Sequence, residues 1–469
     1  MKRIRAASTI AAPAESPATL RAPALAPGAA ARLATLAASA PLLVWPAFWN
    51  GYPLVFADTG TYLGQALIGY LGWDRPPFYS IFLLLTGWRV SLWLPVLAQG
   101  LILAHLLSLV LRVQGLGAPR HLLVAAAALA VLTGLPWFAA QLIPDVFTGA
   151  LVLAVWLLAF RAAALTPAER WWLLLLSTGA VAVHQSHLPL ALGLALVALL
   201  LLGLARGWRA ARPAAPRLLG PPLLAALAIA SVNLAGHGRF SVSPFGSVFL
   251  AARVIADGPG LAYLRAACPN SGYSACRVLD RLGPEHNRFL WEPDSPLHGE
   301  LGGPKVWAPE AASILRGTFA ADPLGEAAAM AENALRQFVL LGTGDGLIPW
   351  PAVPGPAPLI ARFYPQESAA YAAARQQHGT LLPLAEALSP LHVATAGLGF
   401  LALVLLLVLR GRRMTLPAVA LALLVLAAAA GNAAITGALS GPAERYQARL
   451  AWLIAFAPAL LIARPREAA

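Results

Sequence analysis

Charged residues are scarce in this sequence. They make up 11% of the 469 residues, whereas hydrophobic residues make up 59% and the mean hydropathy is +0.69. Soluble domains contain about 25% charged residues, so the composition excludes an ordinary soluble protein and predicts an integral membrane protein. The formal net charge of +13 comes from arginines at the ends of apolar runs. This is the cytoplasmic bias of membrane proteins, so nucleic acid is not an expected partner.

Sequence motifs for nucleotide and hydrolytic chemistry are also missing. The chain contains no P-loop, GxGxxG, HExxH or GxSxG motif in a context that would support it. Cytoplasmic nucleotide chemistry is therefore not expected. No internal repeat is evident, which argues against a transporter built from two inverted halves.

Cysteine is limited to Cys268 and Cys276, which lie eight positions apart in the one long polar segment. If that segment faces an oxidising compartment, the two residues should form a disulfide; otherwise they are two unpaired thiols. Two cysteines do not support a structural zinc site.

The apolar runs predict an all-α polytopic membrane protein with about ten transmembrane helices, since a span needs about 20 apolar residues. The expected spans are 33–49, 92–111, 121–142, 146–160, 171–183, 188–205, 218–235, 391–409, 416–439 and 450–463. The run 78–88 is too short to cross and is expected to lie along the outer interface. Arginines are concentrated in every second segment between spans, which are the segments expected to face the cytoplasm. Both termini are then cytoplasmic as well.

Four parts follow from this topology. They are a disordered cytoplasmic tail (1–32), an N-terminal transmembrane module (33–236) with its first outer loop at 50–80, a mostly α-helical extracytoplasmic domain (237–389) and C-terminal transmembrane helices (390–469). The high content of Ala, Arg and Pro suggests a GC-rich bacterial genome. We therefore expect an inner-membrane protein whose working face is periplasmic.

The predicted topology brings ionisable residues from distant segments to the outer face. Thirteen of the 20 acids lie between Asp257 and Glu386, so acids are rare near the membrane part. The residues expected to converge are Asp58, Asp74, Arg75, Asp145, His184, His187, Glu444, Arg445 and Arg449. Ionisable groups at membrane depth are costly and are treated as functional candidates.

Asp58 and Asp145 each have two interpretations. Partial desolvation at the mouth of a bundle would raise the pKa of Asp58 toward the range of a general base. The alternative is helix capping, because Asp58 precedes Thr-Gly-Thr at a predicted helix start. Asp145 follows Pro144 at the start of a span, where it is either an N-cap or a carboxylate lining a cavity.

The arginines of the outer face are candidates for binding an anion. Prolines follow Asp74 and Arg75 and make the turn rigid. Arg75 could then hold a phosphate through its planar guanidinium, or the two residues could form a structural ion pair. Arg445 and Arg449 share one face of a helix. This pair suits a lipid phosphate, with snorkelling to the headgroups as the alternative.

His184 and His187 end another predicted span. Three roles are open for them: hydrogen bonding to a substrate, structural polar contacts, and metal binding together with Asp58 or Asp145. No cofactor is certain from the sequence, and a divalent metal ion is left open.

The residues of the first outer loop resemble a known family. Asp58 is followed by Tyr62, and Pro76-Pro77-Phe78-Tyr79 leads into an apolar helix. This arrangement, with Ile143-Pro144-Asp145 at the next outer loop, is similar to the GT-C superfamily of polytopic glycosyltransferases. It resembles the bacterial members related to protein mannosyltransferases and the aminoarabinose transferase. The family often has a pair of acids in the first loop, whereas Thr59 follows Asp58 here, and its soluble domain is usually nearer the C-terminus.

The resemblance implies transfer of a sugar from a polyprenyl-phosphate carrier to a glycan, lipid or protein acceptor at the outer face. Asp58 would act as base or orient the acceptor, with Asp145 as the second acid. Outer arginines would hold the carrier phosphate, and Tyr62 and Tyr79 would contribute to substrate binding. Two other functions compete with this one: a transporter or flippase for a lipid-linked saccharide, and a non-catalytic envelope assembly protein that uses residues 237–389 to bind partners.

Overall fold

The computed structural model describes residues 28–351 and 355–463, and every regular element within them is a helix. Most of the expected tail at 1–32 therefore lies outside the described residues. The backbone also makes one isolated β-bridge, between Leu54 and Gln141. The prediction of an all-α fold is confirmed.

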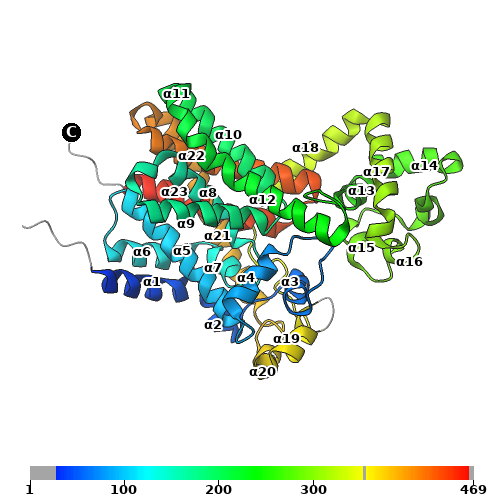
Figure 1. Cartoon of the computed structure of the whole chain (residues 1–469), viewed down its shortest axis with the longest axis horizontal. Coiled ribbons are helices and arrows are strands. Elements are labelled where there is room, and N and C mark those ends of the chain that lie inside the picture. The colour runs from blue at the N-terminus through cyan, green and yellow to red at the C-terminus, as the bar shows by residue number, and fades with distance from the viewer. Residues whose placement is uncertain (1–27, 352–354, 464–469) are drawn as a thin grey trace, which may run out of the picture.

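The larger part of the molecule is a helical bundle (Figure 1). Its N-terminal helices are α1 (Ala29–Leu43), α2 (Trp45–Asn50), α3 (Ala57–Ile68), α4 (Phe78–Gly87), α5 (Trp93–Val113), α6 (Pro119–Leu132), α7 (Leu135–Ala139), α8 (Val146–Phe160), α9 (Pro167–Ala182), α10 (His187–Arg206), α11 (Trp208–Ala211) and α12 (Ala215–His237). Its C-terminal helices are α21 (Leu382–Arg410), α22 (Leu416–Leu439) and α23 (Glu444–Ala463). The start of α1 and the end of α23 lie at the same end of the bundle, at the left in Figure 1.

Six helices of the described chain are long and apolar enough to cross a membrane. They are Trp93–Val113, His187–Arg206, Trp208–His237, Leu382–Arg413, Leu416–Leu439 and Glu444–Ala463. The pair Gly246–Ala256 and Pro259–Cys268, bent by 93°, would add a seventh if it formed one broken span. These helices support a multi-pass membrane protein. The expected number of ten spans is not established.

Two of the expected spans are broken by proline. The run 33–49 is divided into α1 and α2 around Val44, with Pro46 in the first turn of α2. The run 121–142 is divided into α6 and α7, with Pro136 in the first turn of α7. Proline has no N–H group to continue a preceding helix. Each of these two predicted spans is therefore two helices, which hydropathy alone does not distinguish from one.

Helix α8 lies at the centre of the bundle. All 15 of its residues are buried. A helix that is apolar on every side is expected to be surrounded by other helices, and α8 contacts α5, α9, α10, α22 and α23. Asp145 immediately precedes this helix, which places a carboxylate in the interior of the protein.

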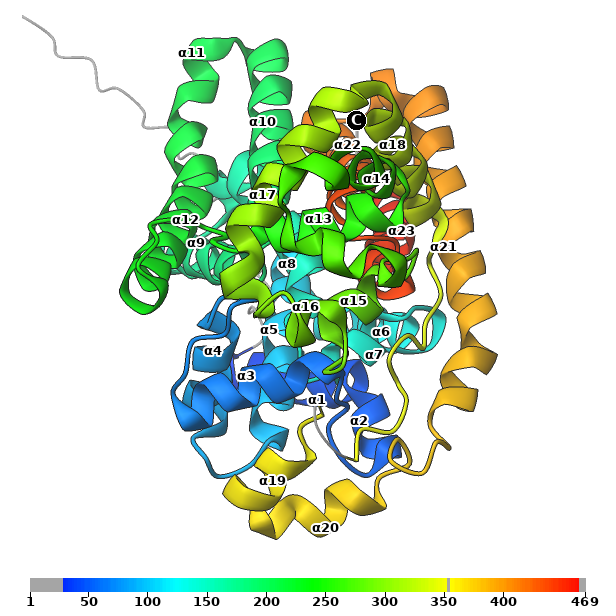
Figure 2. The same ribbon diagram turned by 90° about the vertical axis from the view of Figure 1, so that its right-hand side faces the viewer.

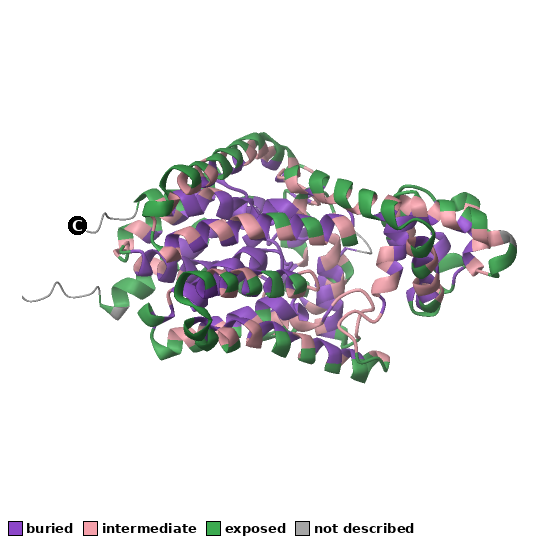
Figure 3. Cartoon of the chain, turned by 90° about the horizontal axis from the view of Figure 1, so that it is seen from above, coloured by how far each residue is buried: buried purple, intermediate pink, exposed green. Residues whose placement is uncertain are grey.

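The segment 237–389, expected to be one outer domain, is divided between two cores. Helices α13 (Gly246–Ala256), α14 (Pro259–Ser271), α15 (His286–Trp291), α16 (Pro296–Gly299) and α17 (Gly303–Ala321) surround a core of their own. We call these five helices the outer domain. Figure 3 shows its separate buried interior at the right of the molecule.

The rest of that segment packs on the bundle. Helix α18 (Pro323–Val339) lies along α22. Helices α19 (Ala357–Phe363) and α20 (Pro365–Ala373) join the bundle core beside the first outer loop. Tyr52 in that loop donates a hydrogen bond to Glu367 Oε2 at 2.7 Å. The first outer loop is therefore held from below by this second half of the polar segment (Figure 2).

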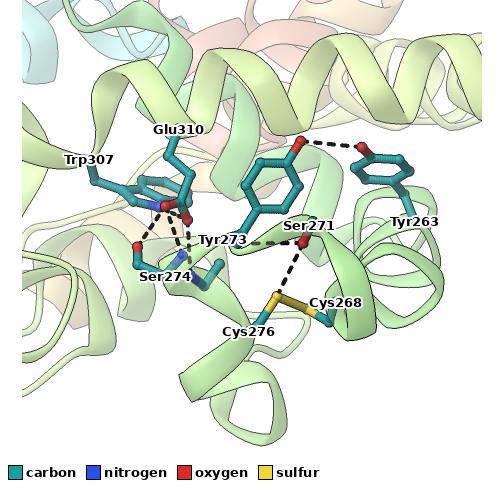
Figure 4. Close-up of a disulfide and its surroundings, with 9 residues drawn as sticks. Tyr263, Cys268, Ser271, Tyr273, Ser274, Cys276, Trp307 and Glu310 are labelled. Atoms are coloured by element: carbon teal, nitrogen blue, oxygen red, sulfur yellow. Dashed lines mark hydrogen bonds between the residues drawn. A yellow bond between two sulfur atoms is a disulfide. The ribbon is translucent and has the colours of Figure 1, made fainter.

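The outer domain contains the expected disulfide between Cys268 and Cys276, with a Cα–Cα distance of 5.3 Å. It joins the end of α14 to the 3-10 helix η3 (Ser274–Arg281). Next to it, Glu310 on α17 accepts hydrogen bonds from Ser274 and from the indole of Trp307 (Figure 4). The disulfide and the Glu310 carboxylate fix the segment 272–276 to helices α14 and α17.

Candidate functional site

The start of α3 determines the direction of Asp58. The helix begins at Ala57, and Thr59 Oγ1 accepts the backbone N–H of Phe56 at 3.0 Å. The same hydroxyl donates to the carbonyl of Leu142 at 3.1 Å. Asp58 therefore lies inside the first turn of α3 and is not its N-cap, and it is Thr59 that binds the N–H of the N-cap residue Phe56. The Asp58 carboxylate is left free to make other contacts.

Asp58 lies between two arginines from distant segments. Arg75 Nη1 is 2.9 Å from Asp58 Oδ1, and Arg445 Nη2 is 3.1 Å from Asp58 Oδ2. Asp74 Oδ2 accepts a hydrogen bond from Arg75 Nε at 2.6 Å. The Asp58 side chain is 20% exposed. We call Asp58, Asp74, Arg75 and Arg445 the outer charge cluster.

Aromatic rings enclose both arginines of the outer charge cluster. Arg75 lies 5.2 Å from the Tyr62 ring and 6.0 Å from the Trp291 ring. Arg445 lies 4.2 Å from the Phe56 ring. Rings at these distances attract a guanidinium electrostatically and limit its movement. Both cations are therefore held in place beside a partly exposed carboxylate.

The two arginines change the acidity of Asp58. Burial alone would raise its pKa, but the charges of Arg75 and Arg445 outweigh burial and lower the pKa of Asp58 to about 2. The expectation that the pKa is raised toward neutrality is therefore wrong for this state of the protein. Asp58 is a weak base while both arginines hold it.

A second ion pair lies deeper in the bundle. Arg449 Nη1 donates to Asp145 Oδ1 at 2.7 Å, and the side chains of Arg449 and Asp145 are 0% and 2% exposed. Arg449 Nη2 also donates to Asn432 Oδ1 at 2.9 Å and to Ser186 Oγ at 3.2 Å. We call Asp145, Arg449, Asn432 and Ser186 the inner polar cluster. The arginine is enclosed by the bundle, so snorkelling to headgroups does not describe it.

The two histidines extend the inner polar cluster toward α8. His187 is buried, with Nε2 2.6 Å from Thr148 Oγ1 and Nδ1 2.6 Å from the carbonyl of Ala180. His184 Nδ1 is 2.8 Å from Ser186 Oγ. Burial and the charge of Arg449 hold the pKa of His184 well below its usual value, so this ring is neutral at physiological pH.

The histidines do not form a metal centre with the acids. Their rings are 5.0 Å apart, but within the described residues no group of three or more His, Cys, Asp or Glu is placed to hold a metal ion. Their contacts are with Thr148, Ala180 and Ser186.

Tyr62 and Tyr79 support the site from inside the protein. Their rings meet edge to face at 4.9 Å, and both are buried. Tyr79 donates a hydrogen bond to Gln99 Oε1 at 2.7 Å, which fixes its ring. Tyr62 contacts the outer charge cluster through its ring, whose centroid lies 5.2 Å from the guanidinium carbon of Arg75.

Several residues of the site were not singled out from the sequence. Trp291, Phe56 and Asp345 approach the outer charge cluster, and Asn432 belongs to the inner one. Asn432 had a recognisable signal, because it is a lone amide inside the apolar run 416–439. Asp345 accepts the backbone N–H of Arg445 at 3.2 Å and lines a cavity of about 460 Å³ with Glu386.

No protein-family model, no curated protein and no solved structure matches this chain. The functional argument therefore rests on the geometry of the two clusters.

Proposed function

We propose that this protein is a membrane glycosyltransferase that moves a sugar from a polyprenyl-phosphate carrier to an acceptor on the periplasmic face. The outer charge cluster is the observation that supports this most directly. In it, Asp58 is held between Arg75 and Arg445. The transfer needs a base for the acceptor hydroxyl and a cationic site for the leaving phosphate. A carboxylate beside two fixed guanidinium groups offers both.

Arg75 and Arg445 are suited to a phosphate monoester or diester. A guanidinium presents paired N–H donors that match phosphate oxygens. Both side chains are little exposed, at 13% and 12%, so an anion that replaced Asp58 as their partner would be bound in a poorly hydrated site. Electrostatic contacts are stronger there than in water.

Binding of a phosphate to the two arginines would also make Asp58 a stronger base. Their charges hold the pKa of Asp58 at about 2, so a phosphate that takes over those charges raises the pKa. The acceptor hydroxyl then attacks the anomeric carbon while its proton passes to Asp58. The bond between that carbon and the phosphate oxygen breaks, and polyprenyl phosphate leaves with both electrons. This is a displacement with inversion, assisted by general base and charge stabilisation.

The membrane arrangement belongs to the same proposal. The ten predicted spans would result if α1, α6, α8 and α9, which cover the runs 33–49, 121–142, 146–160 and 171–183, cross the membrane together with the six longer helices. Both termini would be cytoplasmic, in a bacterial inner membrane. The acceptor would be a glycan, lipid or protein, and the donor lipid would enter from the bilayer.

The inner polar cluster favours a second candidate function, a flippase for a lipid-linked saccharide. Asp145 and Arg449 form an ion pair inside the bundle, and ionisable groups in that position often mark transport pathways. A flippase would move the intact donor across a vesicle membrane, whereas a transferase would cleave it.

The test is turnover of a panel of polyprenyl-phosphate sugars by the purified protein and by Asp58→Asn. We expect release of polyprenyl phosphate by the wild type and a loss of about 10²–10⁴-fold in the variant, the range for removal of a general base. Asp280→Asn is the matched control, because Asp280 is an exposed carboxylate of the outer domain. It should keep wild-type turnover.

Two results would overturn the proposal. One is a wild-type protein that binds no polyprenyl-phosphate sugar, which would favour an assembly protein. The other is transbilayer movement of the intact donor without cleavage, which would favour the flippase. Equal turnover of wild type and Asp58→Asn would keep the enzyme and remove Asp58 from its mechanism.

A further inference from the structure

Three aromatic residues connect the outer domain to the first outer loop. Trp73 of the loop stacks on Phe249 of α13, with ring centroids 5.0 Å apart. Trp291, at the end of α15, lies 5.5 Å from Trp73 and 5.8 Å from Phe249. Trp73 packs against the core of the outer domain although it belongs to the loop. This contact brings α15 to the edge of the outer charge cluster.

Trp291 differs from the other two rings because it is 42% exposed. Its ring centroid is also 6.0 Å from the guanidinium carbon of Arg75, which binds Asp58 at 2.9 Å. A large exposed indole thus lies directly beside a cation that is only 13% exposed. Its contacts with Trp73 and Phe249 hold the ring at that place.

The chemistry of a lipid-linked sugar fits this pair of residues. In such a donor the phosphate is bonded to the sugar on one side and to the lipid chain on the other. A phosphate held by Arg75 therefore carries its sugar within reach of Trp291. The C–H groups on one face of a sugar ring pack well on an aromatic face, which is apolar and carries negative partial charge.

We propose that Trp291 is the stacking surface for the sugar of the donor, so that the outer domain takes part in recognising the sugar. This inference rests on the proposed function, because it assumes that Arg75 holds the donor phosphate. It assigns a ligand contact to the outer domain, whose core is separate from that of the bundle.

The experiment separates binding of the sugar from binding of the phosphate. The full-length protein in nanodiscs is titrated with bare polyprenyl phosphate and with polyprenyl-phosphate mannose, glucose, galactose and N-acetylglucosamine. The dissociation constants are measured for the wild type and for Trp291→Ala. We expect Trp291→Ala to raise the dissociation constant of the tightest-binding sugar-bearing donor by about tenfold, which is the size of one aromatic contact. Binding of bare polyprenyl phosphate should change by less than about twofold.

Three further variants test whether the effect belongs to the indole face. Trp291→Phe keeps an aromatic face and should retain most of the preference for the sugar-bearing donor. Phe249→Leu loosens the aromatic contact that holds the indole but keeps the indole itself, so it should reduce the preference by less than Trp291→Ala does. Trp171→Ala removes an exposed indole on α9 that lies near the Arg112–Glu169 ion pair at the other end of the bundle, and it should have no effect.

The inference is overturned if Trp291→Ala weakens binding of bare and sugar-bearing lipid equally, if Phe249→Leu reduces the preference more than Trp291→Ala does, or if no variant changes the preference. These results would leave the proposed function standing, because binding of polyprenyl phosphate persists in the wild type. Failure of the wild type to bind any polyprenyl phosphate would instead reject the proposed function, and this inference with it.

Discussion

Arg445 Nη2 lies 3.1 Å from Asp58 Oδ2, although 387 positions separate the two residues. One turn further along α23, Arg449 holds Asp145. The last helix of the described chain therefore supplies one cation to each cluster, and the carboxylates that these two cations bind come from α3 and from the residue before α8. Neither cluster is complete until α23 has packed into the bundle.

The first prediction concerns the pH dependence of stability. The pKa of Asp58 falls from its usual 3.8 to about 2 in the folded protein. Folding therefore favours the ionised carboxylate. The stabilisation is fully present above about pH 4 and is lost as the pH falls through about 2. A shift of this size corresponds to roughly 2 kcal/mol.

The measurement compares unfolding of wild type and Asp58→Asn in the same detergent between pH 5 and pH 2. The wild type should be more stable at pH 5, and the difference should shrink as the pH approaches 2. Asp280→Asn should follow the wild-type curve at every pH. A difference between wild type and Asp58→Asn that is constant over this range would show that the arginines do not hold the carboxylate.

The second prediction concerns the buried pair of Asp145 and Arg449. Removal of one partner leaves an uncompensated charge in the bundle, which costs about 3–5 kcal/mol. We expect Asp145→Asn and Arg449→Met each to lower the free energy of unfolding by this amount. The double variant should lose less free energy of unfolding than the sum of the two single losses, because it contains no unpaired buried charge.

A double-mutant cycle in nanodiscs measures the coupling between the two positions. Additive losses would contradict the ion pair. The same variants bear on function, since a flippase that uses this pair would lose transport even in the better-folded double variant. A transferase centred on Asp58 would keep part of its turnover there.

Much of the convergence at the site could be predicted from the sequence. Alternation of apolar runs and arginine-rich ends places Asp58, Arg75 and Arg445 on one face of the membrane, and the structure brings these side chains into contact. Their partners could not be assigned, because a pairing depends on the direction of each side chain. A helix start at Ala57 puts Asp58 inside the first turn and makes Phe56 the N-cap. A start two residues later would have made Asp58 the N-cap.

Other features depend on information that hydropathy does not carry. The breaks near Pro46 and Pro136 lie inside apolar runs that an average over many residues joins together. The segment 237–389 is of mixed polarity, and composition does not say which core each of its helices covers. For the same reason, the approach of Trp291 to Arg75 depends on packing between two separate cores.

The third prediction concerns the packing that positions α23. A Cβ atom added at Gly399 on α21 would lie 2.4 Å from the backbone oxygen of Ile454 and 2.8 Å from Cα of Ala455. Backbone atoms of a packed helix cannot move aside as a flexible side chain can. Gly399→Ala should therefore push α23 away from α21. We expect a loss of about 1–3 kcal/mol, the usual cost of overpacking.

Gly397 provides a matched control on the same helix. A Cβ atom there meets no heavy atom of the described chain within 4 Å, beyond its own helix. Alanine is the better helix former by about 1 kcal/mol, so Gly397→Ala should leave thermal stability unchanged or slightly raised. Because α23 carries Arg445, one of the two arginines proposed to bind the phosphate, Gly399→Ala should also weaken binding of polyprenyl phosphate, whereas Gly397→Ala should not. Equal melting temperatures for the two variants would mean that α21 and α23 are not held at this distance.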